Sequence, residues 1–137
     1  MRFSTKSQYG LRAAVCLAKR NKVTSLKKIA KNENIPFDYL EKIISKLEKA
    51  EIVKSKRGAY GGYFLARPAS KITVSQIVKV LEGTIAPVLC IAEEKSKKFD
   101  CPHEEKCLTK NVWKKVQDAL NETLNSIILA DLINEKK

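Results

Sequence analysis

Histidine and glycine are scarce in this sequence, and their scarcity bears on catalysis. The 137 residues include one histidine and five glycines. No nucleophile can be placed beside that histidine as its base, so the pairing that covalent catalysis needs is missing. The run Gly58–Gly62 lies between two predicted strands, whereas a phosphate-binding glycine loop opens a helix. We therefore do not expect an enzyme.

Long apolar runs are also missing. No stretch reaches the roughly eighteen apolar residues of a membrane span, and the segment Met1–Lys6 lacks the apolar core of a secretory signal. We expect a cytoplasmic protein with no membrane partner. In that compartment the four cysteines are more commonly reduced thiols or metal ligands than disulfides.

Positive charge is abundant and unevenly placed. The formal net charge is +12, and residues 1–70 hold 16 lysines and arginines against 5 acids, whereas residues 71–137 hold 11 against 10. Basic side chains that neutralise phosphates supply most non-specific affinity for nucleic acid. An anionic membrane surface is disfavoured because no segment pairs a strong apolar face with a basic one. The first half of the chain is therefore expected to carry a nucleic-acid interface.

Three helices are predicted in this basic half, over residues 5–20, 24–34 and 36–49. The first is apolar almost all round, which indicates burial on more than one side. Thr5 or Ser7 is a candidate cap for the first helix, and Thr24 or Ser25 for the second. The second and third helices are separated by about four residues, as in a helix-turn-helix. The third buries one face with helical spacing, formed by Leu40, Ile43, Ile44 and Leu47.

A β-hairpin is predicted to follow the third helix. Ile52-Val53 and Tyr63–Leu65 are typical of short strands, and the residues between them are first basic and then rich in glycine. A surface helix and an ordinary hairpin would explain these features separately. Together with the preceding helix, they favour a winged helix-turn-helix, in which one helix enters the major groove and the hairpin reaches the backbone or the minor groove.

The second half contains a short helix, a long loop and a long helix. A helix is expected from Thr73 to Glu82 with Gly83 as its stop, followed by a loop of over twenty residues at 84–106. The apolar stripe that begins near Val112 and runs to Leu132 predicts one helix of about 25 residues, roughly 38 Å long. Such a helix is expected to pack against a symmetry mate, with folding back onto its own domain as the alternative. We divide the chain into a winged helix-turn-helix domain over 1–83, a cysteine-bearing loop over 84–107 and a dimerisation helix over 108–137.

Three of the four cysteines gather in the long loop. Ten residues separate Cys90 from Cys101, and five separate Cys101 from Cys107. Thiolates bind soft metals and iron–sulfur clusters, and this spacing disfavours a zinc ribbon. Incidental or redox-reactive thiols are the alternative. The only histidine, His103, lies between the last two of these cysteines, whereas Cys16 is expected in the core.

The whole chain, to about residue 133, resembles the family of winged-helix regulators that includes IscR, NsrR, RirA and CymR. The residues that carry the resemblance are Met1–Lys6 with Tyr9–Arg12, Asp38–Lys42, the wing Arg57–Tyr63, the three-cysteine loop and the long terminal helix. The resemblance implies a homodimer joined through its C-terminal helices and bound to a partly palindromic DNA operator. It also implies an iron–sulfur cluster on the three loop cysteines, with 2Fe–2S favoured over 4Fe–4S. A preparation made in air can lack such a cluster.

Some residues carry specific expectations from this family. Tyr39 and Glu41 occupy the positions from which the recognition helix contacts DNA in this family. Arg57 occupies the position at which the family places an arginine in the minor groove. Independently, a glutamate can accept from a cytosine amino group, and an arginine suits a narrow minor groove. The full set of candidate DNA contacts is Thr24, Ser25, Lys28, Asp38, Tyr39, Glu41, Lys42, Lys46, Lys56, Arg57, Gly58 and Tyr60.

Two departures from the family pattern leave the fourth cluster ligand open. The gap from Cys90 to Cys101 is longer than usual, and Lys110 and Gln8 stand where some members supply a ligand. The candidates that remain are His103, Gln8, Glu104, Glu105 and a small molecule. The leading hypothesis is a repressor whose operator affinity is set by the cluster. The alternative is a cluster-free regulator controlled by a partner protein or by thiol oxidation.

Overall fold

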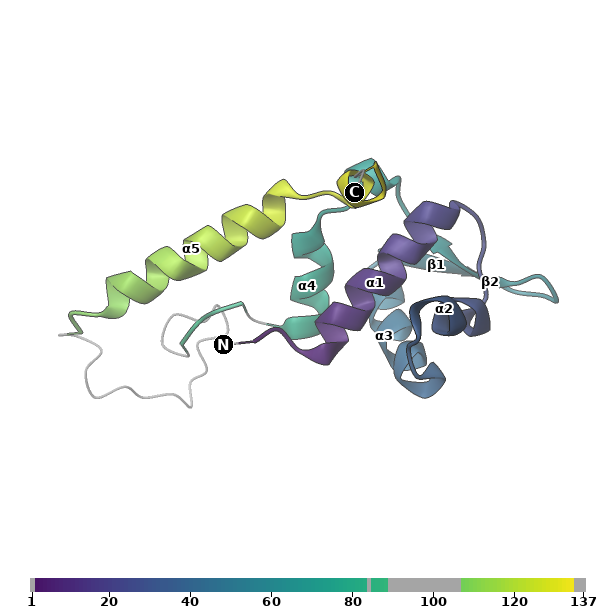
Figure 1. Cartoon of the computed structure of the whole chain (residues 1–137), viewed down its shortest axis with the longest axis horizontal. Coiled ribbons are helices and arrows are strands. Elements are labelled where there is room, and N and C mark those ends of the chain that lie inside the picture. Colours follow the sequence, from purple (N-terminus) through teal and green to yellow (C-terminus); the bar gives the residue numbers. More distant parts are fainter. Residues whose placement is uncertain (1, 84, 89–106, 135–137) are drawn as a thin grey trace.

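The computed structural model describes residues 2–83, 85–88 and 107–134. Its elements, in chain order, are α1 (Thr5–Arg20), α2 (Leu26–Glu33), α3 (Phe37–Lys49), β1 (Val53–Lys56), β2 (Gly62–Leu65), the 3₁₀ helix η1 (Ala69–Lys71), α4 (Val74–Glu82), α5 (Lys110–Ser126) and α6 (Leu129–Asn134). The predicted fold class, mainly α with a small β-wing, is confirmed. Figure 1 shows α1 to α4 and the hairpin gathered at one end, with α5 extending away from them. Within the described ranges, no helix has the length and apolarity needed to span a membrane.

Three helices, α1, α2 and α4, begin at short polar capping side chains close to the predicted boundaries. Ser25 caps α2 by accepting from the Lys28 amide, and Thr73 forms a capping box with Gln76 at the start of α4. At the start of α1 the cap is Ser4, so the expectation of Thr5 or Ser7 was wrong. These caps satisfy amides that the first helical turn leaves unpaired.

The core surrounds α1, which contacts α2, α3, α4, α6 and β2. Its residues Ala13, Ala14 and Leu17 are buried, as expected for a helix that is apolar on more than one side. The four predicted core residues of α3, Leu40, Ile43, Ile44 and Leu47, are all at most 2% exposed. The packing leaves the polar face of α3 at the surface, where it is free to meet a partner.

The wing is a two-stranded antiparallel hairpin attached to the start of α2. Val53 pairs with Leu65 at its base and Lys56 with Gly62 at its outer end. Thr24 adds a bridge to the same sheet, because its amide and carbonyl bond those of Tyr63 at 2.9 and 2.8 Å. The wing therefore has a backbone connection to the residues that lead into the helix-turn-helix.

The C-terminal region departs from the prediction of one helix of about 25 residues. Ile127 has extended backbone angles, and the chain there pairs with the segment before α4: the Val74 amide donates to the Ile127 carbonyl and the Leu129 amide to that of Ile72, both at 2.9 Å. Leu129, fully buried, begins α6, which packs back onto α1 and η1. The apolar stripe therefore continues from α5 into α6, although long-range backbone hydrogen bonds interrupt the helix between them. Most of the predicted loop at 84–106 lies outside the described residues.

The carboxylate of Glu82 joins the end of α4 to the beginning of α1. It accepts from the Ser4 amide at 3.2 Å, from the Ser4 hydroxyl at 2.8 Å and from the Ser7 hydroxyl. Burial acts to raise the pKa of Glu82, but the hydrogen bonds from Ser7 and Ser4 outweigh it and lower the pKa below its ordinary 4.5. The folded state therefore favours the charged carboxylate.

At pH 7 the free energy of unfolding of the Glu82→Gln protein is expected to be about 1–2 kcal/mol lower than that of the wild type, because hydrogen bonds to a charged group are lost. Because the folded-state pKa is depressed, this stabilisation is present above pH 4.5 and disappears as pH falls through the lower folded-state value. Urea unfolding of the two proteins at pH 7 and at pH 3 measures the loss of stability and its dependence on pH. Glu51→Gln, at an exposed position, is the control. A Glu82→Gln deficit that persists undiminished at pH 3 would contradict this account.

Candidate nucleic-acid interface and cysteine segment

The outer face of α3 presents most of the predicted recognition residues. Asp38, Glu41, Lys42 and Lys46 are exposed, whereas Tyr39 is half-buried against the core. These side chains occupy the face opposite the four buried residues of the helix, as the 3.6-residue period requires. The face carries hydrogen-bond donors on its lysines and acceptors on its carboxylates, and both kinds of group are used to read the edges of base pairs.

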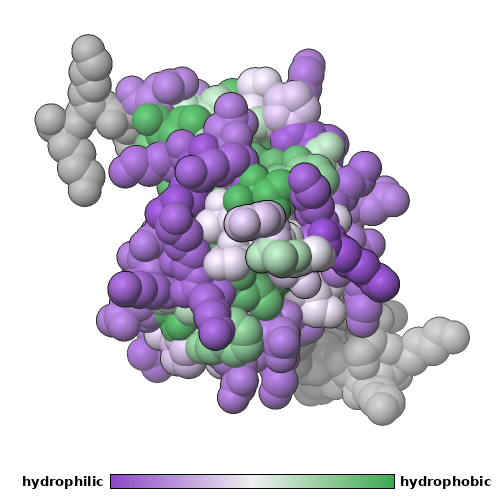
Figure 2. Space-filling model, turned by 90° about the vertical axis from the view of Figure 1, so that its right-hand side faces the viewer, coloured by the Kyte–Doolittle hydropathy of each residue, from purple (hydrophilic) through white to green (hydrophobic). Residues whose placement is uncertain are grey.

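The wing tip presents the next group of predicted contacts. Lys56, Arg57, Gly58 and Tyr60 are exposed, and Tyr60 is 94% exposed, an unusual degree for a large aromatic residue. The tip is closed by a hydrogen bond from the Gly61 amide to the Gly58 carbonyl at 3.0 Å. Gly58 has a φ of 119°, which favours glycine there. Figure 2 shows this end of the molecule, where hydrophilic side chains cover most of the surface.

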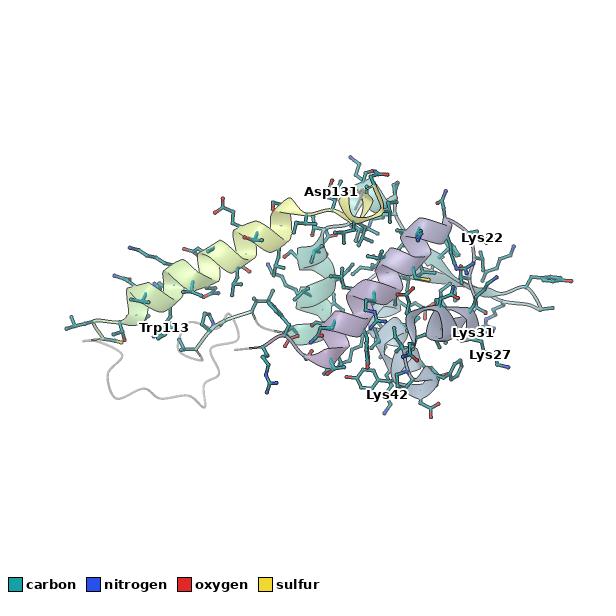
Figure 3. The ribbon with its side chains drawn as sticks, in the orientation of Figure 1. Lys22, Lys27, Lys31, Lys42, Trp113 and Asp131 are labelled. Carbon is teal, nitrogen blue, oxygen red and sulfur yellow. The ribbon has the colours of Figure 1, made fainter. Side chains whose placement is uncertain are left out.

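The start of α2 gives a mixed result for the predicted contacts. Thr24 is only 2% exposed and its hydroxyl donates to the Lys22 carbonyl, so we leave it out of the interface. Ser25 is exposed but acts as the helix cap, and Lys28 is exposed. Sequence reasoning missed Lys27 and Lys31, which are exposed on α2 at the same end as the wing (Figure 3). Their spacing of four residues on a basic helix was a usable signal.

Of the three cysteines in the loop at 84–107, the structure describes the last one, Cys107, just before α5. Its thiol is half-exposed and lies 3.4 Å from the Thr109 hydroxyl. Hydrogen bonds from the Thr109 side chain and backbone lower the pKa of Cys107, which favours the thiolate that binds metals. Cys107 thus fits the chemistry of an iron–sulfur ligand. Cys90, Cys101 and His103 lie outside the described residues.

Cys16 has a different environment. It is 5% exposed within α1, and burial, followed by the nearby Glu33 carboxylate, raises the pKa of its thiol. A neutral, buried thiol behaves as a small apolar side chain. The assignment of Cys16 to the core is confirmed.

One apolar stripe on α5 is covered at its C-terminal end and open at its N-terminal end. Leu120 and Leu124 pack against buried Val74 and Val78 of α4. Toward the N-terminus, Val112, Trp113 and Val116 are 51%, 39% and 38% exposed. Trp113 lies at the far end of the molecule from the lysines of α2 (Figure 3). An apolar helix face that the described residues leave exposed in this way is typical of a protein–protein contact.

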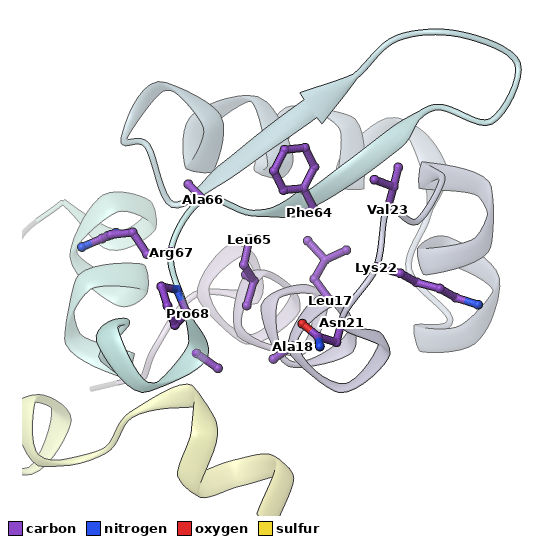
Figure 4. Close-up of a pocket in the computed structure, with 11 residues that line it drawn as sticks. Leu17, Ala18, Asn21, Lys22, Val23, Phe64, Leu65, Ala66, Arg67 and Pro68 are labelled. Atoms are coloured by element: carbon purple, nitrogen blue, oxygen red, sulfur yellow. The ribbon is translucent and has the colours of Figure 1, made fainter.

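A pocket of about 500 Å³ lies on the side of the molecule between the end of α1, the α1–α2 linker and the end of β2. Most of its lining side chains are apolar, including Leu17, Val23 and Leu65. The charged ends of Lys22 and Arg67 point away from it in opposite directions (Figure 4). None of its lining residues is a cysteine or histidine, so it is separate from the predicted metal chemistry.

Helix-turn-helix, wing and basic face together define a winged-helix DNA-binding protein. A family profile described as "Rrf2: Iron-dependent Transcriptional regulator" matches residues 3–135. The chain therefore belongs to the Rrf2 family. It is a transcriptional regulator and not an enzyme, as expected from the sequence.

Individual relatives agree with this assignment. The chain is 41% identical to the HTH-type transcriptional regulator CymR of Bacillus subtilis over 96% of this chain and 89% of that protein. The solved structure of that protein, titled the global cysteine regulator, matches with a TM-score of 0.78 at 38% identity and covers 100% of this chain and 99% of its own. IscR of T. potens matches with a TM-score of 0.77 at 41% identity, over 97% of this chain and 86% of that one. The oxidized form of Staphylococcus aureus CymR matches with a TM-score of 0.76 at 32% identity, over 100% and 99% of the two chains.

Proposed function

We propose that this chain is a homodimeric repressor whose affinity for a partly palindromic operator is set by an iron–sulfur cluster. The observation that carries the proposal is the placement of Cys90, Cys101 and Cys107 within 18 residues between α4 and α5. These three cysteines would hold the cluster, with His103 a candidate for the fourth ligand and 2Fe–2S the favoured type. When bound, the cluster would supply an iron- and redox-sensitive connection across this segment. The half-exposed position of the Cys107 thiol, together with its lowered pKa, supports the assignment.

DNA contacts are assigned to the exposed face of α3, the wing and the start of α2. We retain Asp38, Tyr39, Glu41, Lys42, Lys46, Lys56, Arg57, Gly58, Tyr60, Ser25 and Lys28, and add Lys27 and Lys31. The lysines are assigned to phosphates, which give affinity without sequence preference. Glu41 and Arg57 are assigned to bases in the major and minor grooves.

The position of the cysteine segment suggests how its state reaches the DNA. The segment follows α4, and α4 packs against both α1 and the recognition helix α3. It also precedes α5, whose exposed apolar residues Val112, Trp113 and Val116 we assign to the dimer contact. A change in the segment would alter the spacing between the two recognition helices, which must match half-sites about 34 Å apart.

A cluster-free regulator is the second candidate, and the CymR relatives favour it. One of them is titled a global cysteine regulator, and another was solved in an oxidized form. Under this alternative, the loop cysteines respond to oxidants directly or a partner protein controls the affinity. Mild oxidation would then produce a disulfide between two of the loop cysteines.

Iron and sulfide counts on protein purified without oxygen test the proposal. We expect a coloured protein with about two irons and two sulfides per chain, as a 2Fe–2S cluster requires. Replacing Cys90, Cys101 or Cys107 by alanine is expected to abolish the visible absorption, while Cys16→Ala retains it. A colourless protein after reconstitution with iron and sulfide would overturn cluster control and leave DNA binding untouched.

A further inference from the structure

A chain of side-chain contacts on α1 joins the two helices of the helix-turn-helix. Arg12 Nε lies 3.8 Å from a Glu33 carboxylate oxygen, and its guanidinium donates to the Glu33 backbone carbonyl at the end of α2. The guanidinium carbon of Arg12 is 5.7 Å from the centre of the Tyr9 ring. The Tyr9 and Tyr39 ring centres are 5.6 Å apart with the planes at 89°. The path thus runs from the last residue of α2, across α1, to the first turn of α3.

Each contact restricts one side chain for a physical reason. Arg12 pairs a carbonyl that the end of a helix leaves without a partner, and its cation also faces an aromatic ring. The edge-to-face geometry of Tyr9 and Tyr39 is one of the preferred arrangements of aromatic pairs and depends on ring orientation. Tyr9 and Arg12 are three residues apart, so they share one face of α1. That single face therefore sets the orientation of Tyr39 relative to α2.

We propose that Tyr9 and Arg12 are positioning residues that determine operator specificity by holding Tyr39 on the recognition helix. This inference rests on the proposed function, in which Tyr39 contacts the operator. Neither residue needs to touch a base to have this effect. Non-specific affinity comes from lysine–phosphate contacts, whereas discrimination depends on where recognition-helix side chains lie. Loss of the contact chain is expected to lower specificity while leaving non-specific binding unchanged.

The test is a double-mutant cycle between Tyr9→Leu and Tyr39→Leu. The probes are an operator selected by the wild-type protein from a random duplex pool and an unselected duplex of equal length. Tyr9→Leu is expected to weaken operator binding about tenfold, within the range of coupled neighbours, with unchanged affinity for the unselected duplex. In the Tyr39→Leu background, Tyr9→Leu is expected to cause no further loss. Tyr9→Phe, which retains the ring, is expected to bind as the wild type does.

Two further arms separate positioning from general stability. Arg12→Lys keeps the charge but not the planar group, so it is expected to lower operator affinity in the wild-type background and not in the Tyr39→Leu background. Repeating the selection with Tyr9→Leu is expected to relax the same base positions as Tyr39→Leu. If Tyr9→Leu lowers the midpoint of unfolding, the cycle with Arg12→Lys still decides whether the contact chain acts through Tyr39.

Additive losses in either cycle, or equal losses on both duplexes, would overturn the inference. Those outcomes would leave the proposed function standing, because the wild-type protein would still have selected an operator. A wild-type protein that selects no sequence from the pool would overturn both operator recognition and the inference that rests on it.

Discussion

The Val116→Glu protein is expected to be a folded monomer that has lost operator affinity by on the order of 10²-fold, the advantage that two linked binding events provide. Val116 is 38% exposed on α5 beside Trp113 and Val112, at the uncovered end of an apolar stripe. If this face meets a second copy, a carboxylate there must be buried without a partner, which is strongly unfavourable. The other end of the stripe packs on α4, so the substitution leaves the domain's own core intact.

Sedimentation velocity and operator titration measure this prediction together. Asn125→Glu is the matched control, because it adds the same charge at an exposed position of the same helix, about two and a half turns along and therefore on the opposite face. The control is expected to remain a dimer and to keep operator affinity. If Val116→Glu also remains a dimer, α5 is not the contact and the assignment of this face is wrong.

The Gly62→Ala protein is expected to lose stability by about 3 kcal/mol, as for overpacking that the backbone cannot relieve. A Cβ at Gly62 would overlap the Thr24 carbonyl oxygen and lie 2.7 Å from the Ser25 amide nitrogen. These are backbone atoms of the segment that bridges to Tyr63, so no side-chain rotation removes the overlap. The bridge that attaches the wing to the start of α2 must open.

Operator binding should weaken with it. A displaced wing moves Arg57 relative to α3, and losing a base-contacting arginine costs roughly tenfold to a hundredfold in affinity. Ala59→Ser adds one heavy atom at the exposed tip and is expected to unfold as the wild type does. Urea unfolding of both variants measures the loss of stability, and titration of Gly62→Ala with the operator measures the loss of affinity. Wild-type stability in Gly62→Ala would contradict the steric account of the attachment.

Local patterns were sufficient to predict the helix-turn-helix and the wing. The buried face of α3 follows directly from the spacing of Leu40, Ile43, Ile44 and Leu47, because apolar periodicity and helix geometry share a period. The glycines after Arg57 likewise indicated a tight hairpin tip. Exposure of the polar α3 face followed from burial of the other face. The DNA-binding class was therefore accessible from sequence alone.

Features that depend on distant segments were not accessible. Ile127 and Ile128 continue the apolar stripe of a helix, yet backbone bonds from Val74 and Leu129 hold this region extended. The bridge from Thr24 to Tyr63, which buries a residue that the sequence offered as a DNA contact, likewise joins distant segments. The contact of Tyr9 with Tyr39 also joins separate helices. Such pairings are decided by tertiary packing, which overrides local preference.

The central claim, that a cluster on the loop cysteines sets operator affinity, is tested most directly by one titration. The selected operator is titrated without oxygen, at a single salt concentration, with cluster-loaded protein and with the same preparation after the metal is removed. The account predicts dissociation constants that differ by about tenfold or more, as for a coupling free energy of about 1.4 kcal/mol or above. Equal dissociation constants for the two forms would contradict it, because a cluster that leaves operator affinity unchanged does not regulate binding.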